Sequence, residues 1–367
     1  MRVISIVGAR PNFVKMAPVI SQLMERIGHE NHVLVHTGQH YDRLLSDVFL
    51  EELGVPAPDH VLDVGSGTHA VQTARVMERL EPVLLDEQPD LLVVPGDVNS
   101  TLAAALVSAK LHIPIAHVEA GLRSFDRTMP EEINRILTDQ LAELLFVHSE
   151  EAINNLRREG IASDRIHFVG NTMIDSLVAV EDRFRERRLA RQLGLAEAGY
   201  VLVTLHRPTL VDGPMLEIAL ERLGELAREL PVLFPVHPRT RKTLEALEVP
   251  DHVTLVDPVG YLDFLSLEAD AAAVLTDSGG VQEETTYLGI PCFTLRSTTE
   301  RPVTIANGTN TLLGLEPEQI TAVPTLLQSR PCSVGSPPLW DGRAAERLAD
   351  VLLSAPLGAR TSVAPAV

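Results

Sequence analysis

The segment Leu91-Leu92-Val93-Val94-Pro95-Gly96-Asp97 sets the pattern of this chain: an apolar run that stops at a glycine and an acidic residue. The run is apolar at both parities, as expected for a strand that helices cover on both faces of a sheet. A helical stretch, Ser100–Leu106, comes next. A strand followed by a helix is the repeating unit of a parallel α/β fold.

The same alternation of short apolar run and amphipathic stretch continues almost throughout the chain, which predicts doubly wound α/β domains. The other runs are Val3–Val7, His32–His36, Ile113–Val118, Leu144–Val147, Tyr200–Leu205, Val232–Val236, Val253–Val256, Ala272–Leu275 and Pro291–Leu295.

A length of 367 residues predicts two domains, at roughly 150 residues each. Between the two sets of runs lies Thr172–Leu193, a helical stretch rich in arginine and glutamate. We therefore expect a first Rossmann-like domain over residues 1–170 and a second over 171–342. A last helix at 343–355 would pack back on the fold, and residues 356–367 would form a flexible tail.

The formal net charge of −19 makes nucleic acid and anionic membranes poor partners. The chain starts with a short strand rather than a signal peptide, and no apolar run approaches the ~18 residues of a membrane span. These features predict a cytoplasmic protein. The two cysteines, Cys292 and Cys332, form neither a disulfide framework nor a metal-ligand set, the histidines lack metal-ligand spacing, and we assign no metal.

Nearly every predicted strand ends in glycine, histidine, aspartate or glutamate. In open α/β sheets, ligands bind beyond the carboxyl ends of the strands, so these residues mark the candidate site. The strand ends are Gly8-Ala9-Arg10, His36-Thr37-Gly38-Gln39-His40, Gly96-Asp97, His117-Val118-Glu119, His206-Arg207, His237-Pro238 and Asp277-Ser278-Gly279-Gly280.

Ser278-Gly279-Gly280 joins a strand to a helix. Small residues there let a ligand approach backbone N–H groups, and the helix dipole favours an anion such as a diphosphate. An ordinary strand-to-helix turn would look the same. Glu284, one turn into that helix, is placed to accept hydrogen bonds from ribose hydroxyls.

The segment Gly8–Lys15 is a similar junction in the first domain, with Arg10 and Lys15 as cations and Pro11 at the helix start. It is neither a Gly-x-Gly-x-x-Gly fingerprint nor a Walker loop, so the sequence supports neither NAD nor ATP.

The carboxylate candidates are Asp97, Glu119 and Glu131. Asp97 is also a possible helix N-cap, and Glu131 begins a helix, where acidic residues are common for dipole reasons alone. Arg135, four residues after Glu131, is a possible ion-pair partner for it. His206 and His237 end neighbouring strands, and each is either an acid/base group or a structural histidine.

Taken together, these motifs resemble the non-hydrolysing UDP-N-acetylglucosamine 2-epimerases. They occur in family order between about residues 3 and 310. The matches are Gly8-Ala9-Arg10-Pro11 with Lys15, Thr37-Gly38-Gln39-His40, Gly96-Asp97, His117-Val118-Glu119-Ala120-Gly121-Leu122-Arg123, Pro130-Glu131-Glu132 with Asn134-Arg135, Leu205-His206-Arg207, Pro235-Val236-His237, Thr276-Asp277-Ser278-Gly279-Gly280 with Gln282-Glu283-Glu284, and Thr299-Glu300-Arg301-Pro302.

The resemblance implies a glycosyltransferase-B-like fold, with two Rossmann-like domains facing a cleft and a C-terminal helix crossing back. It implies reversible epimerisation at C2 of UDP-N-acetylglucosamine, by elimination of UDP and its re-addition to a 2-acetamidoglucal, with no cofactor and in a homodimer. Catalysis would involve Asp97, Glu119, Glu131 and His206. The implied substrate contacts are Arg10, Lys15, Gln39, Arg135, His237, Phe264 near uracil, Ser278, Gly279 and Gly280 at the diphosphate, Glu284 at the ribose, and Arg301.

The chain departs from the family pattern after His206. It reads His206-Arg207-Pro208-Thr209-Leu210 where bacterial members usually read His-Arg-Arg-Glu-Asn. In many of those members a second UDP-N-acetylglucosamine activates the enzyme, partly through this region.

The sugar and the reaction class each have competitors. The segment from His36 to Asn134 is similar to relatives that epimerise UDP-2,3-diacetamido-2,3-dideoxyglucuronic acid, which makes that sugar nucleotide the second candidate substrate. A glycosyltransferase on the same fold, or a catalytically silent sugar-nucleotide sensor, would also use the nucleotide motifs. A transferase would not explain the carboxylates of the first domain.

Overall fold

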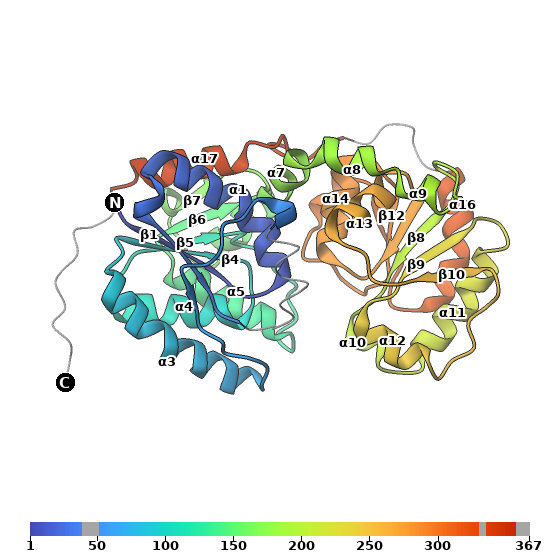
Figure 1. The fold of residues 1–367 in the computed structure, drawn as a ribbon, viewed down its shortest axis with the longest axis horizontal. Helices are drawn as coiled ribbons and strands as arrows, with labels where there is room; N and C mark the ends of the chain where they lie inside the picture. Colours follow the sequence, from blue (N-terminus) through green and yellow to red (C-terminus); the bar gives the residue numbers. More distant parts are fainter. Residues whose placement is uncertain (39–50, 330–334, 357–367) are drawn as a thin grey trace. The chain divides into compact units, whose positions relative to one another are not determined.

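The chain divides into two compact α/β units (Figure 1). The computed structural model describes residues 1–38, 51–329 and 335–356. Unit 1 comprises Met1–Ala179 and Pro338–Val367, and unit 2 comprises Val180–Pro337.

Unit 1 contains a seven-stranded parallel sheet in the order β3-β2-β1-β4-β5-β6-β7. Its strands are β1 (Val3–Val7), β2 (His32–His36), β3 (His60–Val61), β4 (Leu91–Pro95), β5 (Ile115–Val118), β6 (Leu144–Val147) and β7 (Ile166–Phe168). Its α-helices are α1 (Arg10–Ile27), α3 (His69–Glu87), α4 (Asn99–Lys110), α5 (Pro130–Leu141), α6 (Glu150–Arg158), α7 (Thr172–Ala179) and α17 (Ala344–Ser354).

Unit 2 contains a six-stranded parallel sheet in the order β10-β9-β8-β11-β12-β13. Its strands are β8 (Val201–Thr204), β9 (Val232–Pro235), β10 (Val253–Val256), β11 (Ala273–Thr276), β12 (Cys292–Thr294) and β13 (Asn310–Leu312). Its α-helices are α8 (Glu181–Arg187), α9 (Leu189–Gln192), α10 (Pro208–Val211), α11 (Met215–Leu226), α12 (Pro238–Leu244), α13 (Tyr261–Ala269), α14 (Gly279–Leu288), α15 (Val303–Ala306) and α16 (Val323–Gln328).

Both strand orders are the doubly wound order, in which the third, second and first strands precede the fourth, fifth and sixth. The predicted fold class, α/β with two Rossmann-like domains, is therefore confirmed, and it is consistent with the glycosyltransferase-B-like family of folds.

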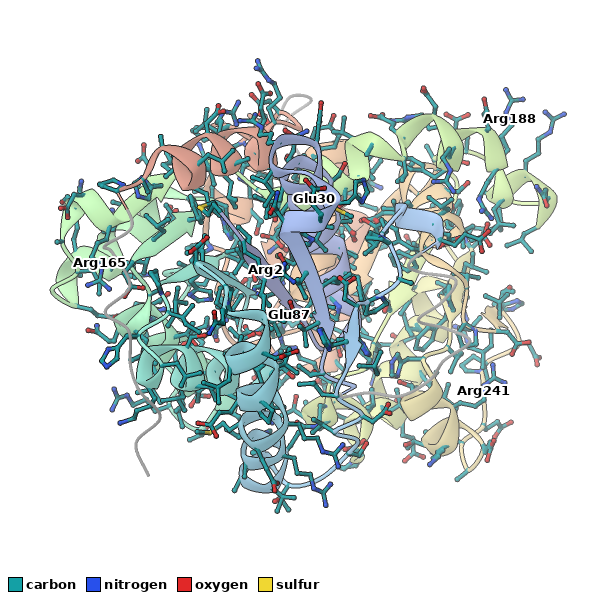
Figure 2. The ribbon with its side chains drawn as sticks, turned by 60° about the vertical axis from the view of Figure 1, so that its left-hand side comes forward. Arg2, Glu30, Glu87, Arg165, Arg188 and Arg241 are labelled. Carbon is teal, nitrogen blue, oxygen red and sulfur yellow. The ribbon has the colours of Figure 1, made fainter. Side chains whose placement is uncertain are left out.

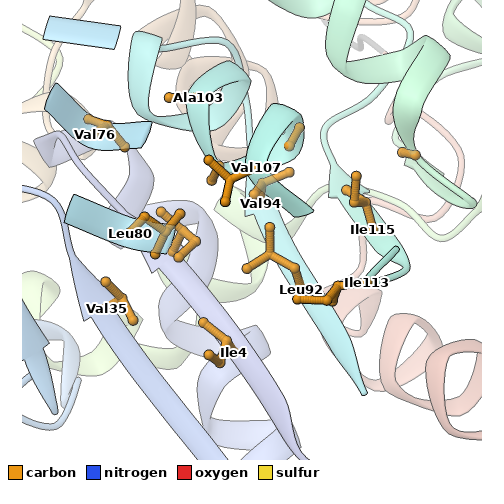
Figure 3. Close-up of a cluster of buried hydrophobic side chains, with 14 of the residues drawn as sticks. Ile4, Val35, Val76, Leu80, Leu92, Val94, Ala103, Val107, Ile113 and Ile115 are labelled. Carbon is orange, nitrogen blue, oxygen red and sulfur yellow. The ribbon is translucent and has the colours of Figure 1, made fainter. Parts of the chain in front are cut away.

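Successive side chains of the central strands point to opposite faces of the sheet, because the side-chain period of a strand is two. In β1, Ile4 and Ile6 pack with α3 and α4, whereas Val3 and Val7 pack with α1 and α17. Figure 3 shows the first of these clusters, where Val76 and Leu80 of α3 lie over the sheet. Burial on both faces explains why these strands are continuous apolar runs.

The division between the units comes after Ala179, later than the predicted boundary at residue 170. The reason is packing, because α7 lies against α1 and belongs with the first sheet. The single predicted helical stretch from Thr172 to Leu193 is three helices, α7, α8 and α9, with a left-handed residue, Arg188, between α8 and α9.

The C-terminal helix α17 packs against α1 and α7 and belongs to unit 1 (Figure 1). Its N-terminus is held by the Asp175 carboxylate, which accepts hydrogen bonds from the backbone N–H groups of Ala344 (3.1 Å) and Ala345 (2.6 Å). Two orphan donors of the helix are thereby satisfied inside unit 1. The predicted flexible tail, apart from its first residue, lies outside the described residues.

Charges at the amino-terminal ends of the strands of unit 1 pair with one another (Figure 2). Glu87 forms an ion pair with Arg2, which Figure 2 labels. His60 Nε2 lies 2.7 Å from Glu87 Oε1, and the Arg2 backbone N–H donates to Asp90 at 2.7 Å. The His60 hydrogen bond holds the pKa of Glu87 below its usual value. These contacts connect β1 and β3 with the end of α3. The candidate site lies at the opposite edge of the sheet, beyond the carboxyl ends of the strands.

None of the helices in the described ranges is long and apolar enough to cross a membrane.

We expect Asp175→Ala to lower the free energy of unfolding by about 1 kcal/mol, because it removes the carboxylate that accepts two N–H groups at the start of α17. Asp350→Ala is the matched control, since it removes an exposed ion pair with Arg26 between α17 and α1 and should cost about 0.5 kcal/mol or less. Urea unfolding of both variants measures the difference. Equal losses would contradict the capping role.

Candidate functional site

The strand order of each sheet reverses at one point, between β1 and β4 in unit 1 and between β8 and β11 in unit 2. Ligands of open α/β sheets bind beyond the carboxyl ends of the strands at such points. In unit 1 this position is occupied by the start of α1 and by Gly96-Asp97, and in unit 2 by His206 and Asp277-Ser278. The candidate site residues of each unit cluster there.

Lys15 and Glu119 form a buried ion pair at this edge of unit 1. Lys15 comes from α1 and Glu119 follows β5 directly. Gly96 makes room for the pair, because a Cβ there would lie 3.0 Å from Lys15 Nζ and 3.2 Å from Glu119 Oε2. Without a partner, either charge would be costly to bury.

The backbone of Glu119 is in the left-handed region, with φ of 68°. Such a conformation costs a non-glycine residue roughly 1–3 kcal/mol and persists only where the surroundings enforce it. Here the next N–H, of Ala120, donates to the carbonyl of Phe146 at 3.0 Å. A strained carboxylate at the switch point of a parallel sheet is typical of a functional residue.

Asp97 is held from α5 on both its side chain and its backbone. Arg135 Nη1 donates to Asp97 Oδ2 at 2.9 Å, and Asn134 Nδ2 donates to the Asp97 carbonyl at 2.8 Å. Asp97 is not an N-cap, because the N-cap of α4 is Val98. About a fifth of its side chain (22%) stays exposed, so the carboxylate remains accessible.

The predicted pairing of Arg135 with Glu131 is wrong. Arg135 pairs instead with Asp97 and, at 3.2 Å, with Glu132. Buried Glu132 also accepts bonds from Ser124 and Phe125, so it shapes the preceding loop. Glu131 is half-buried and makes no hydrogen bond or ion pair within the described part of the chain.

Sequence reasoning assigned no role to two buried residues near these carboxylates. His117 was noted only as part of a strand-end motif, and Asp139 was not noted at all. His117 Nδ1 lies 2.7 Å from Asp139 Oδ1, and Arg123 Nη2 donates to Asp139 Oδ2 at 2.6 Å. Burial opposes the charged form of Asp139, but His117 and Arg123 hold its pKa below the usual value. The available signals were the place of His117 at a strand end and the position of Asp139 one turn after Arg135 on the same face of α5.

His206 and Asp277 meet at the switch point of unit 2. The Asp277 carboxylate accepts the backbone N–H groups of His206 (2.8 Å) and Arg207 (2.7 Å), and His206 Nδ1 lies 3.1 Å from its other oxygen. The His206 ring, about a third exposed, lies 5.6 Å from the ring of His237. Asp277 therefore orients His206, a role that the sequence indicated only by placing both residues at strand ends.

The start of α14 is arranged to receive an anion. Ser278 is its N-cap, and Ser278, Gly279 and Gly280 are all partly exposed. A Cβ on Gly279 would lie 2.5 Å from Arg301 Nη1, so the guanidinium packs directly over this glycine. Arg301 Nε pairs with Glu283 at 2.9 Å, which fixes the guanidinium beside the first turn. A positive helix end with an arginine beside it suits a phosphate.

Two more arginines surround this position. Arg296 binds Glu300 in a bidentate pair at 2.8 and 2.7 Å. The pKa of Arg207 is lowered by burial and by the neighbouring charges of Arg296 and Arg301. Arginines this close repel one another, so an incoming anion would relieve the repulsion.

Glu284 lies in a buried acidic cluster of unit 2. The Tyr261 hydroxyl donates to Glu284 Oε1 at 3.0 Å, and burial raises the pKa of Glu284 to about 7. Glu268 is fully buried, and burial together with the charge of Glu284 raises its pKa well above the usual value. At neutral pH this cluster holds protons, so Glu284 can donate as well as accept hydrogen bonds.

The remaining predicted residues are less informative. Phe264 is half-buried on α13 and packs on the core of unit 2. Gln39 and the side chain of Arg10 lie outside the described residues.

A pocket beside Glu119 lies at the ends of β5, β6 and β7, and its lining consists of Lys15, Val118, Glu119, Phe146, His148, Val169, Gly170, Asn171 and Thr172.

The segment after His206 has a local explanation for its unusual sequence. Pro208 opens the short helix α10, a position that suits proline because its missing N–H is not needed there. Leu210 is fully buried in the core of unit 2, whereas Thr209 is exposed. Leucine at this position contributes to packing instead of offering a polar group.

A family model described as UDP-N-acetylglucosamine 2-epimerase matches residues 24–353. The UDP-N-acetylglucosamine 2-epimerase of Methanocaldococcus jannaschii is 42% identical over 96% of this chain and 99% of its own length. The UDP-2,3-diacetamido-2,3-dideoxy-D-glucuronate 2-epimerase of Pseudomonas aeruginosa is 45% identical over 87% of this chain and 90% of its own. A crystal structure of the M. jannaschii enzyme in complex with UDP-GlcNAc and UDP superposes with a TM-score of 0.89, covering 97% of this chain and 100% of the other at 40% identity.

The raised pKa of Glu284 predicts a pH-dependent stability. Below about pH 4.5 the carboxyl is protonated in both folded and unfolded chains, so the shift has no effect. Between about pH 4.5 and about 7 the unfolded chain ionises while the folded carboxyl stays protonated, so stability falls as the pH rises through this range. Above it both states are ionised and the loss is complete. Glu284→Gln should remove this loss and be more stable than wild type at pH 8 by roughly 1–3 kcal/mol, with little difference at pH 4.

Urea unfolding at the two pH values measures this effect. Glu217→Gln, at an exposed position of α11, is the matched control and should follow wild type at both. A Glu284→Gln variant less stable than wild type at pH 8 would refute the buried protonated carboxyl.

Proposed function

The chain belongs to the UDP-N-acetylglucosamine 2-epimerase family, and we propose that it interconverts UDP-N-acetylglucosamine and UDP-N-acetylmannosamine without a redox cofactor. The observation that carries this proposal is the set of carboxylates at the carboxyl edge of unit 1, where Asp97 and Glu119 each contact a buried cation.

The chemistry has to solve one problem: the proton on sugar C2 is not adjacent to a carbonyl and is barely acidic. If the C1–O bond to UDP breaks, the bonding pair leaves with the diphosphate, and positive charge at C1 acidifies the C2–H bond. A carboxylate then takes the proton, and the electrons of the C2–H bond form the C1=C2 double bond of a 2-acetamidoglucal. Protonation on the opposite face of C2 and addition of UDP to C1 give the epimer.

Unit 1 supplies groups for the proton transfers. Asp97 and Glu119 are tied to Arg135 and Lys15, so both carboxylates are fixed in position beside positive charge. Glu131 has no such partner within the described residues, and protonating it breaks no ion pair. A pair of fixed carboxylates and one unpaired carboxyl suits a reaction that moves a proton off one face of C2 and onto the other.

Unit 2 supplies groups for the leaving diphosphate. The first turn of α14, Ser278 and Arg301 would bind it, and the Arg207 and Arg296 charges would stabilise the negative charge that builds up as the C1–O bond breaks. Glu284 would bind the ribose, and His206, oriented by Asp277, would lie on the UDP side of the reaction.

A glycosyltransferase or a silent sensor would need the nucleotide site of unit 2 but not the paired carboxylates of unit 1. The carboxylate edge therefore favours the epimerase. The diacetamido-uronate sugar nucleotide is the second candidate substrate, supported by the 45% identity to the P. aeruginosa relative named for that reaction. The predicted homodimer and cytoplasmic location stay predictions.

If C2–H is removed in turnover, epimer formed in D2O must carry deuterium at C2. Glu119→Gln and Glu131→Gln should each lose at least ~100-fold in rate, as removing a positioned acid or base does. UDP should still bind to both variants, because its proposed contacts are in unit 2. Proton NMR in D2O with each of the two candidate sugars measures turnover and labelling together.

Epimer that keeps its C2 proton would rule out elimination. Turnover of neither sugar by the wild-type protein would favour the transferase or the sensor.

Gly279→Ala should weaken UDP binding at least ~10-fold, equivalent to about 1.4 kcal/mol. The added Cβ would displace the Arg301 guanidinium from the start of α14. Calorimetry with UDP measures the affinity, and Gly213→Ala is the matched control, since nothing lies within 4 Å of a Cβ there. Equal affinities of the two variants would refute the diphosphate site.

A further inference from the structure

A cluster of buried charged residues lies beneath the carboxylate edge of unit 1. It consists of His117 at the end of β5, Arg123 in the following loop and Asp139 near the end of α5, each no more than 3% exposed. The proposed chemistry does not use these side chains directly. Their arrangement nevertheless bears on every carboxylate that the chemistry does use.

Asp139 binds the loop that follows Glu119 at two points. Its Oδ2 accepts the backbone N–H of Gly121 at 3.2 Å and Arg123 Nη2 at 2.6 Å. Gly121 also has positive φ, and Asn155 Nδ2 donates to its carbonyl at 3.0 Å. Asp139 therefore holds the end of the strained turn that begins at Glu119.

His117 extends the same network to β4. Its Nε2 donates to the carbonyl of Gly96 at 2.7 Å, and its Nδ1 faces Asp139 at 2.7 Å. The Gly96 carbonyl and the Asp139 carboxylate both accept hydrogen bonds, and each lies against one nitrogen of the ring. The result is a buried histidine–carboxylate pair that bridges two strands and a helix.

The three segments that meet at this bridge are the three that carry the carboxylates. Gly96 precedes Asp97, the turn at Gly121 begins at Glu119, and Asp139 shares α5 with Glu131. We propose that His117 and Asp139 are positioning residues that set Glu119 in register with Asp97 and Glu131 for proton transfer at C2. This inference rests on the proposed epimerase function.

The bridge acts on geometry rather than on nucleotide binding, because its contacts are all within unit 1 and the proposed UDP contacts are in unit 2. A shift of about 1 Å in a catalytic group can cost ~100-fold in rate. Losing the bridge should therefore lower kcat while leaving the affinity for UDP unchanged.

The test compares four variants of the full-length chain. Asp139→Ala removes the bonds of Asp139 to His117, Gly121 and Arg123 but leaves the bond from His117 to Gly96. His117→Gln can donate to Gly96 or to Asp139 but not to both. Asp139→Asn can still accept from Gly121 and donate to the His117 ring. Glu159→Gln is the matched control, because Glu159 pairs with Arg123 from the outer side, with a side chain 28% exposed, and its carboxylate binds no part of the turn from Glu119 to Gly121 in the described structure.

We expect kcat for epimerisation to fall at least ~100-fold in Asp139→Ala and at least ~10-fold in His117→Gln. Asp139→Asn should stay within about 10-fold of wild type and Glu159→Gln within about 2-fold. The dissociation constant for UDP, measured by calorimetry, should be unchanged in all four. Because UDP contacts only unit 2 in this proposal, urea unfolding reports whether unit 1 of each variant is folded. If Asp139→Ala does not fold, His117→Gln carries the test.

Wild-type kcat in folded Asp139→Ala or His117→Gln would overturn the inference, as would an Asp139→Asn variant as slow as Asp139→Ala. If the wild-type protein epimerises no sugar, the proposed function fails, and the bridge is tested by hydrogen exchange at the Gly121 amide. That exchange should be faster in Asp139→Ala and unchanged in Glu159→Gln, and unchanged exchange in both would refute the positioning of the turn.

Discussion

Burying a charge without a partner costs several kcal/mol, and this cost shapes the carboxyl edge of unit 1. Three acidic side chains, of Glu119, Glu132 and Asp139, are almost fully buried there. Each contacts a buried cation: Lys15 for Glu119, Arg135 for Glu132, and Arg123 for Asp139. The carboxylates can remain at the sheet edge because their countercharges are part of the same fold.

Pairing also restricts where each carboxylate can move. Arg135 contacts Asp97 and Glu132 at once, and Asn134 on the same helix holds the Asp97 backbone. The helix α5 thus orients a carboxylate that belongs to another element, while its own Glu131 stays unpaired among the described residues. Protonating Asp97 or Glu119 breaks an ion pair, whereas protonating Glu131 breaks none within the described residues. Acid–base chemistry needs carboxyl groups that differ in this way.

The sequence predicted the central strands and one edge strand, β10, but not the other three edge strands. Central strands such as β1 and β4 are buried on both faces and therefore appear as unbroken apolar runs. The edge strands β3, β7 and β13 did not stand out, because they have two or three residues each and are partly exposed. An edge strand needs no continuous apolar run, so its pattern merges with that of the loops.

Motifs and spacing located the candidate site but not its ion pairs. A spacing of four on a helix predicted an ion pair between Glu131 and Arg135. Arg135 pairs instead with Asp97, which follows β4, and with Glu132 of its own helix. Arg135 pairs with these buried partners because a buried charge gains more free energy from a partner than an exposed charge does. The same limit hid His117 and Asp139, whose roles come from residues 22 positions apart meeting at 2.7 Å.

The two units share one strand order, but the charges at their switch points differ: unit 1 presents carboxylates and unit 2 presents positive groups. The fold alone therefore does not decide the function. A glycine lies against a cation in both: a Cβ on Gly96 would lie 3.0 Å from Lys15 Nζ, and one on Gly279 would lie 2.5 Å from Arg301 Nη1. In unit 1 that cation faces Glu119, and the site presents carboxylates. In unit 2 Arg301 lies beside the positive end of α14 with Arg207 and Arg296 nearby, and the site favours an anion. One backbone arrangement thus suits the proposed proton transfer in unit 1 and the proposed phosphate binding in unit 2. Arg301 also pairs with Glu283, so the difference in unit 2 comes from the helix end and from the additional arginines.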